Sequence, residues 1–208
     1  MTAGARRGRP SSEDVDRDVL DVVAGLIARR GIKDTAVQAV ADRSGYSKAG
    51  VLARFTSKDL LVEAALAQCA AQTEAVLRAV RDLPVGPARD AAALAGITDL
   101  ALARPGWAEL ALAAFTLHRG DDVGARLVPV AATLLELFGT DPGDPTATPL
   151  DRRARVSGAF GAIVMLALTY EDDASAAEAR PHVLRVAWDA LGHDGGFPHA
   201  AGEVGRVG

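Results

Sequence analysis

The stretch TAVQAVADRSGYSKAGVLARF, residues 35–55, has the pattern of two short helices joined by a tight turn. The first helix is expected to begin at Thr35, whose hydroxyl can cap free backbone N–H groups. Ser44-Gly45 supplies the break, because glycine accepts the positive φ that such a corner requires. Ser47 can cap the second helix. The stretch therefore predicts a helix-turn-helix unit.

The outward side of the second helix carries the residues expected to meet a DNA groove, since Val51 and Phe55 occupy its inward face. Cationic side chains there would mainly hold phosphates, whereas Gln38 and Lys48 could also reach base edges. Small residues permit close backbone approach, and apolar ones suit thymine methyl groups. The expected DNA contacts in this unit are Thr35, Gln38, Ser47, Lys48, Ala49, Gly50, Leu52, Ala53, Arg54 and Lys58.

This unit resembles the DNA-binding domain of TetR-type transcriptional regulators, and the resemblance covers about the first third of the chain. Leu52 and Ala53 stand where many relatives carry aromatic groups, and Gly50 replaces the usual Thr or Ser. The operator contacts therefore cannot be copied from the family. The family pattern is matched by Gly31, Thr35, Val37, Val40-Ala41, Ser44 to Lys48, Leu52 to Phe55 and Ser57 to Leu61.

The resemblance implies an all-helical protein with a three-helix DNA-binding domain joined by a long helix to a larger domain. We expect a disordered basic arm at 1–12, the DNA-binding domain at 13–60, an effector-binding and dimerisation domain at 61–192, and a flexible tail at 193–208. In the arm, Arg7 and Arg9 flank a glycine as in an AT-hook, which favours minor-groove contact over a merely solvated charged tail.

Composition supports the same fold class. The 208 residues are 49% hydrophobic but only 4% aromatic, and no useful alternating β-branched run occurs, which favours helices. The single cysteine suits a reducing cytoplasm. The N-terminus lacks the apolar core of a secretion signal, and the longest apolar run, 159–170, is too short to span a bilayer. The sequence therefore predicts a cytoplasmic protein with no membrane partner.

Charge is divided unevenly along the chain. Residues 1–58 hold 11 Lys and Arg against 7 Asp and Glu, whereas the remaining 150 residues hold 12 against 20. A basic front and an acidic back would orient the protein on double-stranded DNA, because phosphate attraction is confined to the front.

Apolar residues recur at helical spacing through the rest of the chain. Ser57 is expected to cap a long helix over 58–83, which would connect the two domains. Gly31 should end the first helix, and Pro181 should delay or kink the last. The other expected helices cover residues 14–30, 88–103, 105–118, 121–138, 150–170 and 174–191.

Two functions of the second domain are implied by the resemblance. One is a pocket for a small, mostly apolar effector, with plain core packing of the same residues as the alternative. The other is homodimerisation through the last two helices, which could instead complete the subunit's own core; a dimer would read two half-sites. The expected pocket residues are Trp107, Phe115, His118, Phe160, Met165 and Tyr170, and the expected dimer residues are Ala162, Leu166, Val183, Val186, Ala187 and Ala190.

Catalytic signals are missing from the sequence. The four histidines lack zinc-site spacing, and neither a nucleophile elbow nor a glycine-rich phosphate loop occurs. We therefore expect no enzyme activity, metal or cofactor, and interpret the chain as a ligand-responsive transcriptional regulator, more plausibly a repressor. The alternatives are an architectural DNA-binding protein without an effector, and a helical enzyme or carrier with a vestigial front domain.

Overall fold

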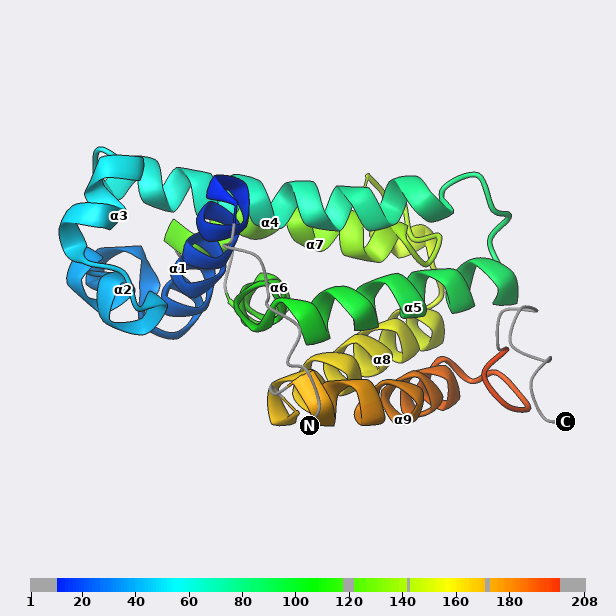
Figure 1. Cartoon of the computed structure of the whole chain (residues 1–208). Coiled ribbons are helices and arrows are strands. Elements are labelled where there is room, and N and C mark those ends of the chain that lie inside the picture. Colours follow the sequence, from blue (N-terminus) through cyan, green and yellow to red (C-terminus); the bar gives the residue numbers. More distant parts are fainter. Residues whose placement is uncertain (1–10, 118–121, 142, 171–172, 199–208) are drawn as a thin grey trace, which may run out of the picture.

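The computed structural model of the protein describes residues 11–117, 122–141, 143–170 and 173–198. Every regular element in these ranges is a helix, which confirms the predicted fold class. The helices form three layers behind a compact front end (Figure 1). Three of the predicted site residues, Arg7, Arg9 and His118, lie outside the described ranges.

The front end consists of α1 (Ser12–Asp34), α2 (Val37–Ser44) and α3 (Lys48–Arg54). A capping box fixes the start of α1, because the Ser11 and Asp14 side chains each accept a hydrogen bond from the other's backbone N–H. Gly31 breaks α1 with a φ of 79°, at the predicted position, although the helix resumes for one further turn.

The predicted capping role of Thr35 is wrong. The N-cap of α2 is Ala36, and no side chain caps this helix. The Thr35 side chain is buried, and its hydroxyl donates instead to the Gly31 carbonyl oxygen at 2.8 Å. A threonine hydroxyl can serve either a following helix or a preceding carbonyl, and here it stabilises the break in α1.

The long helix α4 (Lys58–Val80) runs along one side of the molecule from the front end (Figure 1). As predicted, Ser57 caps it, and its hydroxyl oxygen accepts from the Leu60 N–H at 3.2 Å. It packs against α1, α5 and α7. Among the described residues α4 is also the one helix long and apolar enough to cross a membrane by length and composition, which the interior helices of soluble proteins often are.

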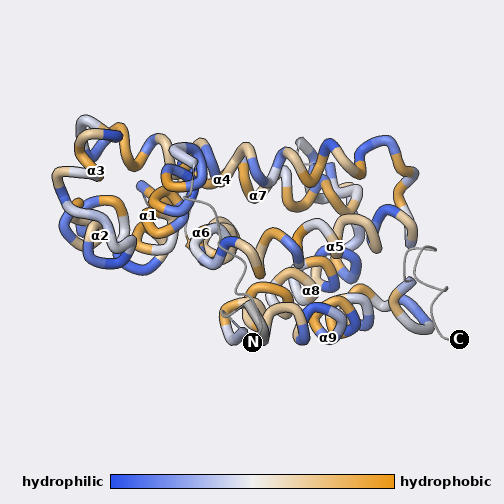
Figure 2. The backbone as a smooth tube through the Cα atoms, viewed as in Figure 1, coloured by the Kyte–Doolittle hydropathy of each residue, from blue (hydrophilic) through white to orange (hydrophobic). Residues whose placement is uncertain are grey.

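The second domain is built from the remaining helices, stacked in layers with α5 and α6 between α4 and the α8–α9 pair (Figure 1). The last helix continues through Pro181, so of the two predicted effects of this proline the delayed start is wrong. Apolar and polar residues alternate along the helices, and the apolar ones form a core shared by both domains (Figure 2). The helices are α5 (Pro87–Ala103), α6 (Pro105–Thr116), α7 (Asp122–Glu136), the 3₁₀ turn η1 (Pro145–Ala147), α8 (Leu150–Thr169) and α9 (Asp173–Leu191).

His193 and Phe197 pack on Trp188 of the second domain, so the prediction of a flexible tail from residue 193 is wrong for these two residues; residues 199–208 lie outside the described ranges. The His193 Nε2 lies 2.8 Å from a carboxylate oxygen of buried Asp90, and the His193 ring stacks on Trp188. Arg152 holds the same carboxylate at 2.7 and 2.8 Å. The end of the chain is thereby joined to the start of α5 and α8.

Candidate nucleic-acid interface

The corner between α2 and α3 is closed by Gly45, which has a left-handed conformation with φ 75° and ψ 9°. Ser47 caps α3, and its hydroxyl oxygen accepts from the Gly50 N–H at 3.0 Å. Val51 is fully buried against the front core, and Phe55 packs on its edge. The turn and both anchors agree with the sequence prediction.

The opposite side of α3 faces solvent. Lys48, Ala49, Ala53 and Arg54 are exposed, as is Ser47 in the turn. Gly50, Leu52 and Lys58 are partly exposed, and Gln38 is exposed on α2. Thr35 differs from the other predicted contacts in the described ranges, because its burial keeps it off this surface.

Two of the predicted phosphate contacts already have partners within the domain. Arg54 donates to the backbone and hydroxyl oxygens of Ser12 at 3.2 and 3.0 Å and forms an ion pair with Asp16. The Lys58 ammonium donates to the Lys33 carbonyl oxygen at 2.7 Å. These cations therefore position α3 and α4 on α1 as well as adding positive charge to the front.

Gln38 has a hydrogen-bond partner within the domain, whereas Lys48 has none in the described part of the chain. The Gln38 amide donates to Asp42 at 2.8 Å, so it must leave that partner to reach a base. Lys48 is exposed and has no partner among the described residues. Arg43 and Tyr46, which the sequence did not single out as contacts, are exposed beside the same corner. Their position next to the Ser44-Gly45 turn could have identified them from the sequence as candidate DNA contacts.

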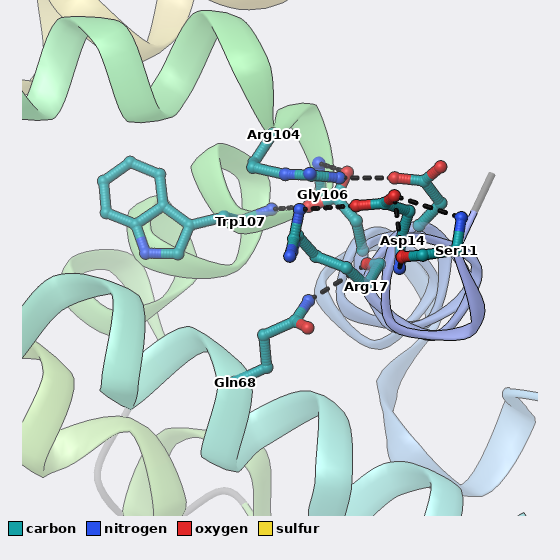
Figure 3. Close-up of polar contacts among 9 residues, drawn as sticks. Ser11, Asp14, Arg17, Gln68, Arg104, Gly106 and Trp107 are labelled. Atoms are coloured by element: carbon teal, nitrogen blue, oxygen red, sulfur yellow. Dashed lines mark hydrogen bonds and ion pairs between the residues drawn. The ribbon is translucent and has the colours of Figure 1, made fainter. Parts of the chain in front are cut away.

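The front end is joined to the second domain by a polar contact between α1 and α6 (Figure 3). The Asp21 carboxylate accepts from the backbone N–H groups of Gly106 at 3.0 Å and Trp107 at 2.9 Å, so it caps the N-terminus of α6. Beside it, Arg104 pairs with Asp18 at 2.6 Å. Burial raises the pKa of Asp21, and the two N–H donors oppose that rise.

Gly106 allows this contact to form. A Cβ at this position would lie 1.8 Å from the Asp21 carbonyl oxygen, so no larger residue fits without moving one helix. Further along the same helices, Arg29 forms an ion pair with Glu109. The start of α6 is therefore held against α1 by backbone proximity as well as by charge.

A second contact fixes α6 to α4. The Trp107 indole N–H donates to the Thr73 hydroxyl at 3.0 Å, and that hydroxyl donates to the Cys69 carbonyl oxygen at 2.8 Å. All three residues are buried, and burial raises the pKa of the Cys69 thiol to about 12. A displacement of α6 would consequently act on α1 and α4 together.

Of the described residues predicted to line an effector pocket, only Tyr170 borders one of the two prominent cavities. Trp107 is fully buried, and Phe115 and Phe160 pack against each other with ring centroids 5.0 Å apart. Met165 and Tyr170 are 66% and 40% exposed at the surface of the second domain. The effector pocket therefore stays a prediction, because helical spacing cannot distinguish an aromatic residue that fills a core from one that borders a pocket.

Two cavities are prominent among the described residues, and neither lies between the middle helices. One of about 340 Å³ lies between α8 and α9, bordered in part by Tyr170 and Val186. The other, of about 400 Å³, lies beside the end of α1 near Gly31 and Val123. In the described ranges, no group of three or more His, Cys, Asp or Glu side chains is placed to hold a metal ion.

The residues predicted at the dimer interface divide into two groups. Val183 and Ala187 are buried within the subunit, where α8 and α9 pack together. Ala162, Leu166 and Ala190 are partly exposed, and Val186 is 45% exposed. The first pair therefore belongs to the subunit's own core, which was the alternative interpretation.

A family profile described as "Bacterial regulatory proteins, tetR family" matches residues 19–65. The N-terminal domain belongs to the tetR family. The match contains most of α1, all of α2 and α3, and the start of α4, so it covers the helix-turn-helix unit and its supporting helices. No curated protein matches the chain.

Solved structures extend the similarity beyond the tetR-family domain to the whole fold. A TetR-like transcriptional regulator from Rhodococcus sp. RHA1 has 19% identity and a TM-score of 0.56, and the match covers 89% of this chain and 100% of that one. The transcriptional regulator FadR from Bacillus subtilis, in complex with stearoyl-CoA, has 14% identity and a TM-score of 0.50, with 82% and 96% covered. At these identities the likeness establishes the fold alone.

Proposed function

We propose that the protein is a cytoplasmic transcriptional regulator that binds a palindromic operator in double-stranded DNA as a homodimer. The observation that carries this proposal is the exposed, basic outer side of α3 on a tetR-family helix-turn-helix domain. Residues 31–58 hold five Lys and Arg against two Asp. Positive charge is thus concentrated where a recognition helix meets phosphates, while the remainder of the chain is acidic.

Regulation by a small-molecule effector is supported by the rigid connection between the domains. Asp21 and Gly106 hold α6 on α1, and Trp107 holds it on α4. An effector that displaces α6 would alter the spacing of the two recognition helices in a dimer. A coupling free energy of about 1 to 3 kcal/mol would weaken operator binding about 5- to 150-fold, and a repressor coupled in this way is released by its effector.

The proposed activity needs no cofactor and no catalytic step, because binding and release of DNA are sufficient for regulation. Lys48 is the residue on which the DNA assignment depends most, since its side chain is exposed and uncommitted. Arg54 and Lys58 contribute to the positive potential and also position the recognition helix.

The proposal is tested by selecting bound sequences from random duplex DNA at near-physiological salt. A two-fold symmetric consensus is expected. Lys48→Ala should then weaken binding to that consensus and reduce the salt slope by about one, because one phosphate contact is lost. Arg78→Ala, which removes an exposed charge at the distant end of α4, is the matched control. If Lys48→Ala and Arg78→Ala bind the consensus with the same affinity and the same salt dependence, Lys48 on α3 does not contact the DNA.

A second candidate function is an architectural DNA-binding protein without an effector. The packing of the middle helices favours it, since Trp107 is fully buried and Phe115 and Phe160 pack against each other. This function predicts enrichment of A·T-rich DNA without a symmetric consensus in the same selection experiment.

A further inference from the structure

The start of α1 is held in place by three separate contacts. The capping box described above fixes its first backbone groups. The Gln68 amide of α4 donates to the Arg17 carbonyl oxygen at 3.1 Å (Figure 3). The third contact comes from Arg54, the last residue of α3. The point at which residues 1–10 join the DNA-binding domain is therefore fixed relative to the recognition helix.

The contact made by Arg54 combines hydrogen bonds with an ion pair. Its guanidinium donates to the backbone and hydroxyl oxygens of Ser12 at 3.2 and 3.0 Å and pairs with the Asp16 carboxylate. The side chains of Arg54 and Asp16 are 32% and 39% exposed. Because the pair has no net charge, Arg54 adds less attraction for phosphates than an unpaired lysine such as Lys48.

The arginines of the predicted basic arm follow closely from this contact along the chain. Arg7 and Arg9 lie outside the described ranges, four and two residues before Ser11. An extended chain spans at most about 3.6 Å per residue, so their Cα atoms lie within about 14 and 7 Å of the Ser11 Cα. These lengths are comparable with the width of the major groove, about 12 Å. The stretch of minor groove that the two arginines can reach is therefore decided by where Ser11 is held.

We propose that Arg54 is a positioning residue for the basic arm. It holds Ser12 and Asp16 against the end of α3, so that Arg7 and Arg9 enter the minor groove next to the major groove that α3 occupies. Arg54 thereby couples the reading of one groove to the reading of the other. This role rests on the proposed DNA-binding function, and it replaces the phosphate contact that the sequence predicts for Arg54.

The base pairs that flank the site of α3 distinguish the two roles of Arg54. Arginines that enter the minor groove favour A·T pairs, where the groove is narrow and its negative potential is enhanced. A G·C pair adds the guanine N2 amino group to this groove. An inosine·cytosine pair lacks that amino group but presents the major-groove edge of G·C. Flanks of these three kinds therefore separate minor-groove from major-groove reading.

Fluorescence anisotropy measures binding of the full-length protein to three duplexes with one common centre and A·T, G·C or inosine·cytosine flanks. The centre is the selected consensus, or one fixed sequence if none is selected. The wild type is expected to bind the A·T and inosine·cytosine duplexes about 10-fold more tightly than the G·C duplex. Arg54→Ala should bind all three with the wild type's affinity for the G·C duplex. A wild type without flank preference, or an equal loss on all three duplexes in Arg54→Ala, would overturn the proposal.

Asp16→Ala gives opposite results for the two roles. If Arg54 contacts a phosphate, its release from Asp16 should strengthen binding to all three duplexes. If Arg54 positions the arm, the preference for A·T flanks should fall although a negative charge has been removed. Glu13→Ala is the matched control, because it removes an exposed carboxylate from the same end of α1 and should leave the preference unchanged. An equal change in both variants contradicts the positioning role.

A double-mutant cycle tests the coupling between Arg54 and the arm. Arg54→Ala should have no further effect on binding in a chain that already carries Arg7→Ala and Arg9→Ala. Losses that add contradict the proposal. A symmetric consensus without an Arg54-dependent flank preference would overturn this inference and leave the proposed regulator intact. A flank preference that depends on Arg54, in a protein that selects no consensus, would support the inference and overturn the regulator.

Discussion

Thr73 is a single residue on which the connection between α4 and α6 depends. Its hydroxyl accepts from the Trp107 indole and donates to the Cys69 carbonyl, all in the buried core. Both the indole N–H and the hydroxyl are thus satisfied, which is the condition for burying them without loss of stability.

Thr73→Val should lower the free energy of unfolding by about 1 to 3 kcal/mol, because it leaves the Trp107 N–H buried without an acceptor. Urea denaturation of the variant measures this loss. Adding Trp107→Phe to Thr73→Val supplies the control, since the double variant has no unsatisfied donor. If the loss of unfolding free energy in the double variant equals the sum of the losses in Thr73→Val and Trp107→Phe, the hydrogen bond contributes nothing.

Asp21 predicts a specific dependence of stability on pH. Burial raises its pKa above the ordinary value of 3.8, so the folded protein retains the proton more strongly than the unfolded chain. The contribution of Asp21 to stability is therefore complete below the unfolded pKa and is lost as pH rises through the folded pKa. The stability of the wild type relative to Asp21→Asn should fall over that window, as measured by urea denaturation. If the unfolding free energy of the wild type rises with pH relative to that of Asp21→Asn, the pKa of Asp21 is not raised.

At the scale of the elements, helices α1 and α6 approach each other closely at Gly106. Gly106→Ala would place a methyl group against the Asp21 carbonyl, and we expect a loss of about 3 kcal/mol in unfolding free energy from overpacking. Gly158→Ala, within α8, is the control: its Cβ would meet open space, and removing a helical glycine should stabilise the subunit by about 0.5 to 1 kcal/mol. Thermal unfolding of both variants checks the contrast, and equal effects would contradict it.

The elements that the sequence predicts best are those determined by neighbouring residues. Ser47, Gly45 and Ser57 act on backbone groups within three residues, so their roles can be inferred from local sequence. The partners of Arg54 and His193 lie 38 and 103 residues away, and no local pattern indicates them. Hence the helix-turn-helix unit was predictable, while the α1–α3 ion pair and the packing of His193 were not.

The candidate interface shows the same division between local and distant determinants. The outward side of α3 follows from helical spacing, which correctly exposes Lys48 and buries Val51. Whether an aromatic residue fills the core or borders a cavity depends on how separate helices meet. That is why the sequence could not show that Trp107 and Phe160 are buried in the core.

On the scale of the whole molecule, the exposed side of α8 and α9 is the surface on which we expect a second subunit to pack. Met165 and Val186 are 66% and 45% exposed there. Apolar exposure of this kind is typical of interfaces between subunits.

Met165→Asp together with Val186→Asp should convert the dimer to a monomer, because charges would be buried without partners at the interface. Sedimentation velocity measures the change. Leu150→Asp is the matched control: this leucine is 72% exposed at the start of α8, and the dimer should persist. A dimer that survives the double substitution would place the interface elsewhere.

The two tryptophans of the chain give the molecule an intrinsic optical reporter of one domain. Trp107 and Trp188 both lie in the second domain, so ultraviolet emission does not register melting of the front helices directly. Trp188 stacks on the His193 ring with centroids 3.9 Å apart, so the surroundings of its indole depend on whether residue 193 stays packed. Separation of His193 from Trp188 would therefore change the tryptophan emission, which offers a label-free way to follow this contact.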